Sequence, residues 1–338
     1  MKGQRKQHRW AGALVVLWLS VGSAPAWAAT ITVISTADSG GTCPGATCTL
    51  RQAIADAASG DTIDFNVSLP TITLASQLTL NKNLTITGPG ANQLAISGGG
   101  TVRVMAVTAD VTVNISGLTI RNGSGDFGGG ISNAGTVTVS NSTFSGNSAT
   151  FEGGGIFNGP AGTVAVSNST FSGNSADSDG GGIFNSFGTV TVSNSTFSGN
   201  SASDLGGGIY NVGPATVNVR GTIIANSPSG DNCRGTGLTS QGDNISSDGS
   251  CVATSIPLND RNNTDPLLNA LANNGGPTQT FALQNTSPAV NTVTVNTCPL
   301  PAMDQRWGGF NRPAGAACDI GAFELGATPV ELQEFVVE

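Results

Sequence analysis

The chain has 338 residues and is poor in charge: 10% of its residues are charged, 5% are aromatic and 48 are Gly. A helical bundle covers its outer faces with Glu and Lys, so this composition argues against that class. With 38% hydrophobic residues, it also argues against charge-driven disorder. What remains is a protein of short strands joined by Gly-rich turns.

The N-terminus has the pattern of a secretory signal peptide. Four basic residues at positions 2–9 precede an apolar run at 11–22, and Ala26-Trp27-Ala28 follows as a small-x-small cleavage site. The apolar run is too short to be a membrane span. We therefore expect residues 1–28 to be removed on export, leaving a mature chain without a transmembrane segment. A retained anchor is the alternative.

The sole histidine, His8, lies within this predicted leader, so the mature chain has none. This excludes Ser-His-Asp and Cys-His catalysis and zinc sites with histidine ligands. Removal of the leader leaves nine of the 13 basic residues against all 21 acids, a net charge of −12. Nucleic acid is not expected as a partner, because no basic patch is available to neutralise phosphates.

The cysteines indicate disulfides, because their number is even and the chain carries an export signal. A zinc site is the weaker alternative, since no CxxC pair occurs. Of the possible pairings we favour the one that is local in sequence, 43–48, 233–251 and 298–318. The six residues are Cys43, Cys48, Cys233, Cys251, Cys298 and Cys318.

A nearly identical repeat occupies residues 135–159, 162–186 and 188–212. In its first copy we expect three short strands, at 136–140, 142–145 and 155–158, from their period-two alternation. No helical pattern fits between them. A repeat of three strands and three turns is one coil of a solenoid. We therefore predict an all-β fold, a single-stranded right-handed parallel β-helix of the pectate-lyase type with a short N-terminal capping helix.

Stacking of the coils predicts ladders of identical side chains inside the solenoid, about 4.8 Å apart. Each Gly-Gly-Gly before a repeat Ile is interpreted as a turn with positive φ and close coil packing. Buried Asn side chains at the bends can bond the backbone and one another. The expected ladders are Val137, Val164, Val190 and Val217; Phe144, Phe171, Phe197 and Ile223; Ile131, Ile156, Ile183 and Ile209; Asn147, Asn174, Asn200 and Asn226; and Asn158, Asn185 and Asn211.

Both ends of the solenoid need caps, because open strand edges invite aggregation. Thr49 to Gln52 forms a capping-box pattern that predicts a helix at 49–59, with Gly60 as its stop. We divide the mature chain into an N-terminal cap with irregular coils (29–110), regular coils (111–228), irregular C-terminal coils with disulfides (229–325) and a tail (326–338).

Two motifs carry a resemblance to exported bacterial proteins. Cys48 to Ile54 (CTLRQAI) resembles the CSLREAI domain found at the N-termini of such β-helix proteins. Phe144 to Asn147 (FSGN), with its two copies and the GGG-Ile units, is similar to the FxxN and GGA-Ile repeats of chlamydial polymorphic outer-membrane proteins. The third Gly replaces the usual Ala of those repeats.

A third resemblance lies near the C-terminus. Gly275 to Thr280 (GGPTQT), Asp304 to Arg306 (DQR) and Cys318 to Glu324 (CDIGAFE) are similar to the choice-of-anchor Q domain. Together the resemblances imply a right-handed β-helix that is secreted or held at a bacterial surface or outer membrane, where many such proteins are adhesive or contact polysaccharide.

Five acids lie four to six residues before the repeat Ile, so stacked coils would bring them together in a row. Solvated loop acids are the simpler interpretation. The alternative is a calcium site that bridges coils, because closely spaced carboxylates repel unless they are neutralised. No other cofactor and no catalytic residue is expected. The five residues are Asp126, Glu152, Asp177, Asp179 and Asp204.

Together these features favour a non-enzymatic module, adhesive or in contact with polysaccharide, whose partner is an extracellular polysaccharide or the surface of a host or neighbouring cell. A carbohydrate-active enzyme, either a lyase or a hydrolase, is the main alternative, since β-helices can carry such sites. A purely structural spacer is the third. We expect a monomer.

Overall fold

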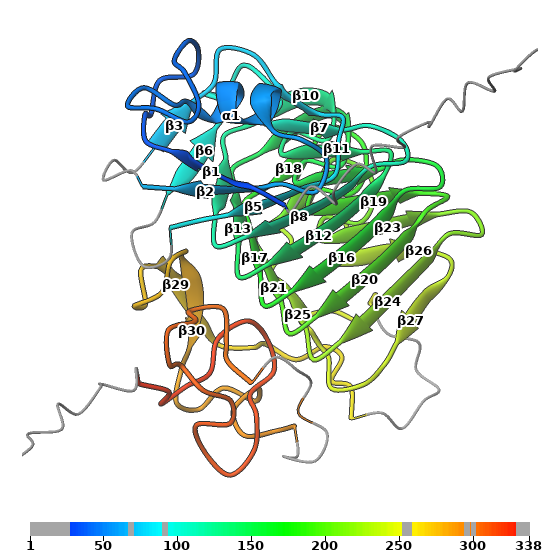
Figure 1. Ribbon diagram of the computed structural model, residues 1–338. Coiled ribbons are helices and arrows are strands. Elements are labelled where there is room, and N and C mark those ends of the chain that lie inside the picture. The colour runs from blue at the N-terminus through cyan, green and yellow to red at the C-terminus, as the bar shows by residue number, and fades with distance from the viewer. Residues whose placement is uncertain are drawn as a thin grey trace, which may run out of the picture.

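The computed structural model describes residues 28–66, 71–89, 94–251, 259–293, 298 and 302–328. The predicted leader lies outside these residues except for Ala28, and so does the tail beyond residue 328. The rest forms a solenoid of stacked coils, with one short helix at its N-terminal end (Figure 1). Among the described segments, no helix is long and apolar enough to cross a membrane.

The solenoid is walled by parallel sheets that we number in the order in which one coil visits them. The first sheet contains β1 (Thr30–Val33), β2 (Thr62–Phe65), β5 (Leu84–Thr87), β8 (Thr112–Ser116), β12 (Thr136–Ser140), β16 (Thr163–Ser167), β20 (Thr189–Ser193), β24 (Thr216–Arg220) and β27 (Leu238–Ser240). The second contains β3 (Thr71–Thr73), β6 (Ala95–Ser97), β9 (Thr119–Arg121), β13 (Thr143–Ser145), β17 (Thr170–Ser172), β21 (Thr196–Ser198), β25 (Ile223–Ala225) and β28 (Ile245–Ser246).

The third sheet is the shortest and the fourth closes the coil. The third contains β10 (Ser124–Phe127), β14 (Ser148–Glu152), β18 (Ser175–Ala176) and β22 (Ser201–Ala202). The fourth contains β4 (Leu78–Leu80), β7 (Met105–Val107), β11 (Ile131–Asn133), β15 (Ile156–Asn158), β19 (Ile183–Ser186), β23 (Ile209–Val212) and β26 (Cys233–Gly235). Each coil thus has four strands in its regular part, and the sequence predicted only three.

The third sheet escaped prediction because it carries almost no apolar signal. Its inward side chains in the regular coils are Ala149, Ala176 and Ala202, and its outer residues differ between repeats. A run with one small inward residue has no period-two hydrophobic pattern. Its strands are held by backbone pairing to the coils above and below.

The register of the regular coils confirms the predicted Val, Phe and Ile ladders. Val137 pairs with Val164, Phe144 with Phe171 and Ile156 with Ile183, and the same pairing continues into the next coil. The three Phe rings are fully buried and stack at 4.6 and 4.4 Å between centroids. These ladders form the core along the solenoid axis.

The predicted fourth member of the Phe ladder was wrong by one residue. Ile224, not Ile223, pairs with Phe197, because the chain keeps the same spacing from the preceding strand of the first sheet. Ile223 faces outward and is nevertheless fully buried, since the C-terminal segment covers it.

The same shift removes Asn226 from the predicted Asn ladder. Asn226 is exposed and follows Ala225, the partner of Ser198, so it occupies the position of Gly199 and shares that residue's positive φ. The ladder itself runs through Asn147, Asn174 and Asn200, whose side chains are joined by two hydrogen bonds of 2.8 Å.

A second buried Asn ladder begins one coil earlier than predicted. Asn133 Nδ2 donates to Asn158 Oδ1 at 2.8 Å, and Asn158 and Asn185 continue the chain of bonds to Asn211, each at 2.7 Å. Each Nδ2 also donates to a backbone carbonyl at the bend. The backbone carbonyls at this bend therefore receive hydrogen bonds from side chains inside the solenoid.

The capping helix α1 (Leu50–Asp56) is shorter than predicted. Thr49 is its N-cap and accepts a hydrogen bond from the Gln52 N–H, as the capping-box pattern indicates. The helix ends when Ala57 takes an extended conformation, three residues before Gly60. Leu50, Ala53 and Ile54 bury its apolar face against the first coil.

Of the predicted irregular coils at 229–325, the first part, through β28, extends the solenoid by one more coil. The last coil ends with β28, and the chain then folds back along the outer face of the second sheet, with a hairpin of β29 (Leu268–Ala272) and β30 (Thr280–Leu283) (Figure 1). We call the described residues from 259 to 328 the flanking segment. Three outward Thr residues of successive coils form hydrogen bonds with it. Thr143 Oγ1 donates to the Gln279 carbonyl, Thr170 Oγ1 to Gln305 Oε1, and Thr196 Oγ1 accepts from the Ala322 N–H.

The six cysteines form the sequence-local pairs that we favoured: Cys43–Cys48, Cys233–Cys251 and Cys298–Cys318. The first lies beside the N-cap of α1, the second fastens β26 in the last coil, and the third lies in the flanking segment. No cysteine is free for nucleophilic chemistry.

Candidate functional site

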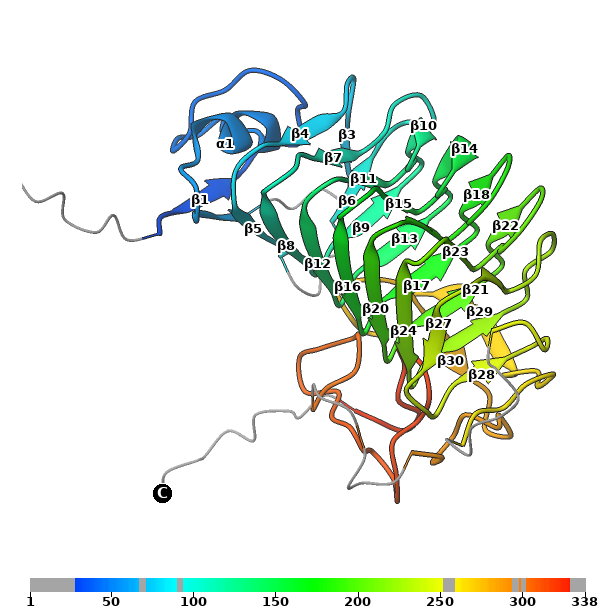
Figure 2. The same ribbon diagram turned by 90° about the vertical axis from the view of Figure 1, so that its right-hand side faces the viewer.

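The five predicted acids lie in the strands of the third sheet or in the turns that follow them. The strands of this sheet, β10, β14, β18 and β22, form one edge of the solenoid (Figure 2). Only two of the acids are in direct register: Glu152 and Asp179 pair across adjacent coils in a parallel bridge. In the flanking coils the same position holds Phe127 and Leu205. The other three acids, Asp126, Asp177 and Asp204, are exposed and offset along the chain. We call the five residues the acidic edge.

A row of aromatic rings lies beside the acidic edge. We define the aromatic face as Phe127, Phe151, Phe157, Phe184 and Tyr210. Successive ring centroids are 5.2–5.6 Å apart, close to the rise of about 4.8 Å per coil. Phe127 and Phe151 are 39% and 48% exposed, and Phe157 and Tyr210 are partly exposed, while Phe184 is buried between its neighbours.

The repeat places these rings by simple alternation. In β15 the side chain of Ile156 points into the core, so that of Phe157 points outward, and Phe184 and Tyr210 pair with it in register. The first Gly of each triplet lets the chain turn between the acid and the ring. Gly153 has a φ of 72°, and a Cβ there would lie 2.8 Å from the Phe157 Cα. The acidic edge and the aromatic face are therefore adjacent parts of one surface.

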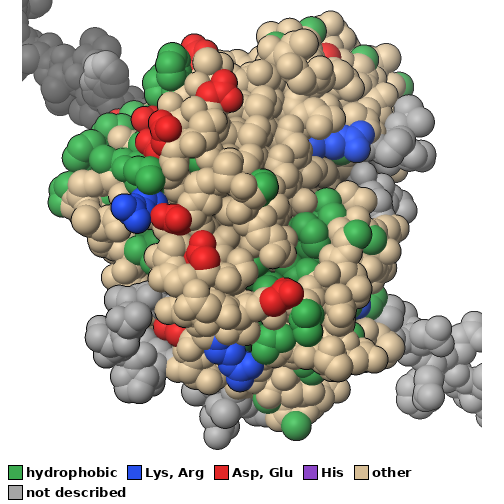
Figure 3. Space-filling model, turned by 180° about the vertical axis from the view of Figure 1, so that it is seen from behind, with side chains coloured by type: hydrophobic (Ala, Val, Ile, Leu, Met, Phe, Trp, Pro, Cys, Tyr) green, Lys and Arg blue, Asp and Glu red, His purple; other side chains and the backbone are tan. Residues whose placement is uncertain are grey.

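The space-filling view agrees with this arrangement. Seen from behind, acidic side chains lie next to hydrophobic ones along one side of the molecule, and few basic side chains interrupt them (Figure 3). Single exposed apolar side chains are normal, whereas a contiguous row of exposed rings is typical of an interaction site.

The paired acids hold protons more tightly than ordinary carboxyls. Partial burial raises the pKa of Glu152, and the neighbouring Asp179 raises it further. Burial also raises the pKa of Asp179; the Leu205 N–H opposes that shift and Asp204 adds to it. Burial raises the pKa of Tyr210 too, with Asp179 as the next cause. The Tyr210 hydroxyl therefore lies within the field of the acidic edge.

This proximity gives a spectroscopic prediction. We expect Asp179→Asn to lower the pKa of Tyr210 towards its ordinary value, because one of the two carboxylates that disfavour tyrosinate is removed. Tyr210 is the only tyrosine, so the ultraviolet absorbance of tyrosinate during an alkaline titration reports on it alone. Asp110→Asn, on the exposed turn before β8, is the matched control. Equal midpoints in both variants would contradict the placement of Asp179.

Calcium binding at the acidic edge stays a prediction. Among the described residues, no group of three or more His, Cys, Asp or Glu side chains is placed to hold a metal ion. Because Asp126, Asp177 and Asp204 are offset, the pair Glu152–Asp179 alone offers two carboxylates in register. Calorimetric titration with calcium tests the idea: heat at millimolar metal that disappears in Glu152→Gln would support it, and no heat would contradict it.

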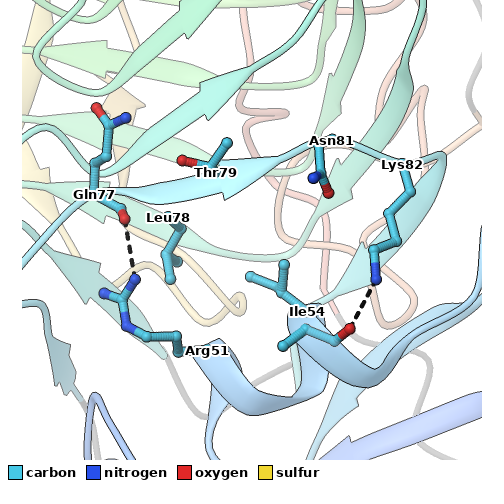
Figure 4. Close-up of a pocket in the computed structure, with 8 residues that line it drawn as sticks. Arg51, Ile54, Gln77, Leu78, Thr79, Asn81 and Lys82 are labelled. Atoms are coloured by element: carbon cyan, nitrogen blue, oxygen red, sulfur yellow. Dashed lines mark hydrogen bonds between the residues drawn. The ribbon is translucent and has the colours of Figure 1, made fainter.

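A cavity of about 330 Å³ lies at the N-terminal end of the fourth sheet, between α1 and β4 (Figure 4). The two cationic side chains that line it, Arg51 and Lys82, already donate hydrogen bonds to backbone carbonyls. Lys82 Nζ donates to the carbonyls of Ala55 and Ala57 at the end of α1, and Arg51 Nη1 donates to that of Gln77. These hydrogen bonds across the cavity therefore connect the helix to the first coils.

The flanking segment contains a buried ionic cluster that no substrate can reach. Arg306 forms a 2.6 Å ion pair with Asp304, and its guanidinium lies 4.0 and 3.9 Å from the ring centroids of Phe310 and Phe323. Burial, with Asp319 adding to it, raises the pKa of Glu324 to about 7. Asp304 and Glu324 are fully buried. The DQR and CDIGAFE motifs therefore serve the packing of this segment.

The aromatic face was not predicted from the sequence, although the signal was present. An aromatic residue follows the repeat Ile in three successive copies, at Phe157, Phe184 and Tyr210. Since the Ile points inward, the next residue of a strand points outward. Phe127 and Phe151 carried no such signal, because they lie in the third sheet, where the repeats differ.

A comparison with models of protein families supports the fold. Residues 72–224 match the family model of a right-handed β-helix region. The crystal structure of pectate lyase Pel9A is similar with a TM-score of 0.47 and 13% identity, and the match covers 88% of this chain and 97% of that one. A likeness this remote says nothing about the activity of this chain. No curated protein is significantly similar in sequence. The chain has the fold of a right-handed parallel β-helix.

Proposed function

We propose that the protein is an exported β-helix module that binds polysaccharide along its aromatic face without chemical turnover. The observation that carries the proposal is the row of rings at the spacing of the coils, flanked by carboxylates. Apolar faces of sugar rings stack on aromatic side chains, and sugar hydroxyls donate to carboxylates. A surface that repeats once per coil suits a polymer that repeats once per sugar.

Export is part of this proposal. Three disulfides form in oxidising compartments outside the cytosol, and the N-terminal pattern is that of a secretory leader. The resemblances to the CSLREAI domain, the chlamydial repeats and the choice-of-anchor Q domain favour a place at a bacterial surface, where binding to polysaccharide would make the module adhesive.

The binding test compares two exposed phenylalanines. We expect Phe151→Ala to weaken binding of neutral oligosaccharides roughly tenfold or more, because Phe151 is the most exposed ring of the row and truncation of an aromatic hot spot has an effect of that size. Phe187→Ala is the matched control, because Phe187 is 55% exposed but lies outside the ring row. Isothermal titration calorimetry with a panel of hexasaccharides measures both. Equal losses in the two variants, or no binding by the unmodified protein to any member of the panel, would contradict the proposal.

One observation favours a second candidate, a glycosidase. Retaining glycosidases hold two carboxyl groups about 5–5.5 Å apart. The backbones of paired residues in adjacent coils are about 4.8 Å apart, so their side chains can reach that separation. Glu152 and Asp179 form such a pair, and the pKa of each is raised. Release of reducing ends from a polysaccharide, abolished by Glu152→Gln, would replace the binding proposal with this one. Absence of both binding and turnover would favour a spacer.

A further inference from the structure

The charge on the aromatic face restricts the class of polysaccharide that it can hold. Five carboxylates, those of the acidic edge, lie beside the rings. Among the described residues, the cations near this surface lie at its ends. Arg103 donates to the carbonyls of Phe127 and Gly128 at one end, and Arg234 pairs with Asp231 at the other. The middle of the face, around Glu152 and Asp179, is therefore negative and uncompensated.

The raised pKa values of three groups on this surface agree with a negative charge at its middle. After burial, the next cause that raises the pKa is a neighbouring acid for Glu152 and for Tyr210. The neighbouring Asp204 also raises the pKa of Asp179, whereas the hydrogen bond from the Leu205 N–H lowers it. A cation that entered this region would relieve these repulsions, whereas a further anion would add to them.

From the ring row and this charge we infer that the aromatic face selects polysaccharides that carry protonated amino groups. The inference rests on the proposed function, because the rings supply the stacking surface for any sugar. The acidic edge then adds ion pairs to ammonium groups on successive sugars. Polymers of uronic acids are rejected, because their carboxylates would lie against Glu152 and Asp179. Neutral polymers bind through stacking and hydroxyl hydrogen bonds alone.

Three hexamers of equal length test the selection: glucosamine, N-acetylglucosamine and galacturonic acid. Calorimetry with the purified protein at mildly acidic pH and low salt should show the glucosamine hexamer binding about tenfold more tightly than the N-acetylated one, as two or three partly exposed ion pairs allow. Galacturonate should bind most weakly. Added salt should erase the advantage of the amine, because exposed charges are screened, and should leave the neutral hexamer unaffected.

A double variant separates charge from stacking. Glu152→Gln with Asp179→Asn should bring the glucosamine hexamer to the affinity of the N-acetylated one, while Asp110→Asn leaves the ratio unchanged. Equal affinities of the two hexamers for the unmodified protein, or tightest binding of galacturonate, would overturn the selection and leave the binding proposal standing. If none of the three binds, the proposed function fails and the selection fails with it.

Discussion

Replacing Arg306 by Met is expected to lower the free energy of unfolding by about 3–5 kcal/mol, the range for breaking a buried ion pair on one side. Asp304 is fully buried and accepts hydrogen bonds from the Arg306 guanidinium and from the Arg306 and Glu324 N–H groups. Without the guanidinium, the buried charge of Asp304 loses its ion-pair partner, and the nearby Arg312 is already shared with Glu324. Urea unfolding followed by circular dichroism measures the loss.

The matched control is Arg234→Met. Arg234 and Asp231 also form an ion pair, at 3.3 Å, but their side chains are 57% and 47% exposed. Such a pair contributes roughly 0–1 kcal/mol. If the two variants lose the same stability, the buried cluster does not hold the flanking segment against the second sheet.

Replacing Phe171 by Ala is the second change with a large expected effect. Phe171 is fully buried and stacks between Phe144 and Phe197 in adjacent coils. Truncation leaves a cavity that the flanking rings cannot fill, because their own coils fix their backbones. A loss of about 3–5 kcal/mol in the free energy of unfolding is expected.

Phe187→Ala serves as control for this change as well, since the same atoms are removed from a 55% exposed side chain. Chemical denaturation of both variants gives the comparison. A loss below about 1 kcal/mol in Phe171→Ala would mean that the Phe ladder does not carry the core, because fully burying a Phe side chain already contributes more than that.

The parts of the fold that the sequence predicted are those where the repeat is nearly exact. Identical spacing placed Val137, Phe144 and Ile156 in their ladders, since stacked coils must align equal positions. Where the repeat becomes irregular, the prediction was wrong by one residue. Ile223 is followed by a second isoleucine, Ile224, and only the spacing from β24 decides which of the two faces the core. The short third sheet was missed because its inward residues are alanines.

The remaining differences between the predicted and the observed fold come from tertiary contacts. The packing of the flanking segment on Thr143, Thr170 and Thr196 depends on contacts between residues more than 120 positions apart, which no local pattern encodes.

For the candidate site, the sequence predicted a row of five stacked acids, and the structure pairs two of them, Glu152 and Asp179, in register. The aromatic face was not predicted, although the alternation of β15 directs Phe157 outward and the repeat stacks Phe184 and Tyr210 on it.

The central claim is that polysaccharide binds on the aromatic face, and Tyr210 offers a direct measurement of it. Tyr210 is the only tyrosine of the chain and lies on that face, so the protein labelled at the ε positions of its tyrosine ring gives one ring signal in an NMR spectrum. We expect this signal to shift progressively as a binding oligosaccharide is added, with the dissociation constant that calorimetry gives. Calorimetric binding that leaves the Tyr210 signal unmoved would contradict the claim, because the sugar would then occupy another surface of the solenoid.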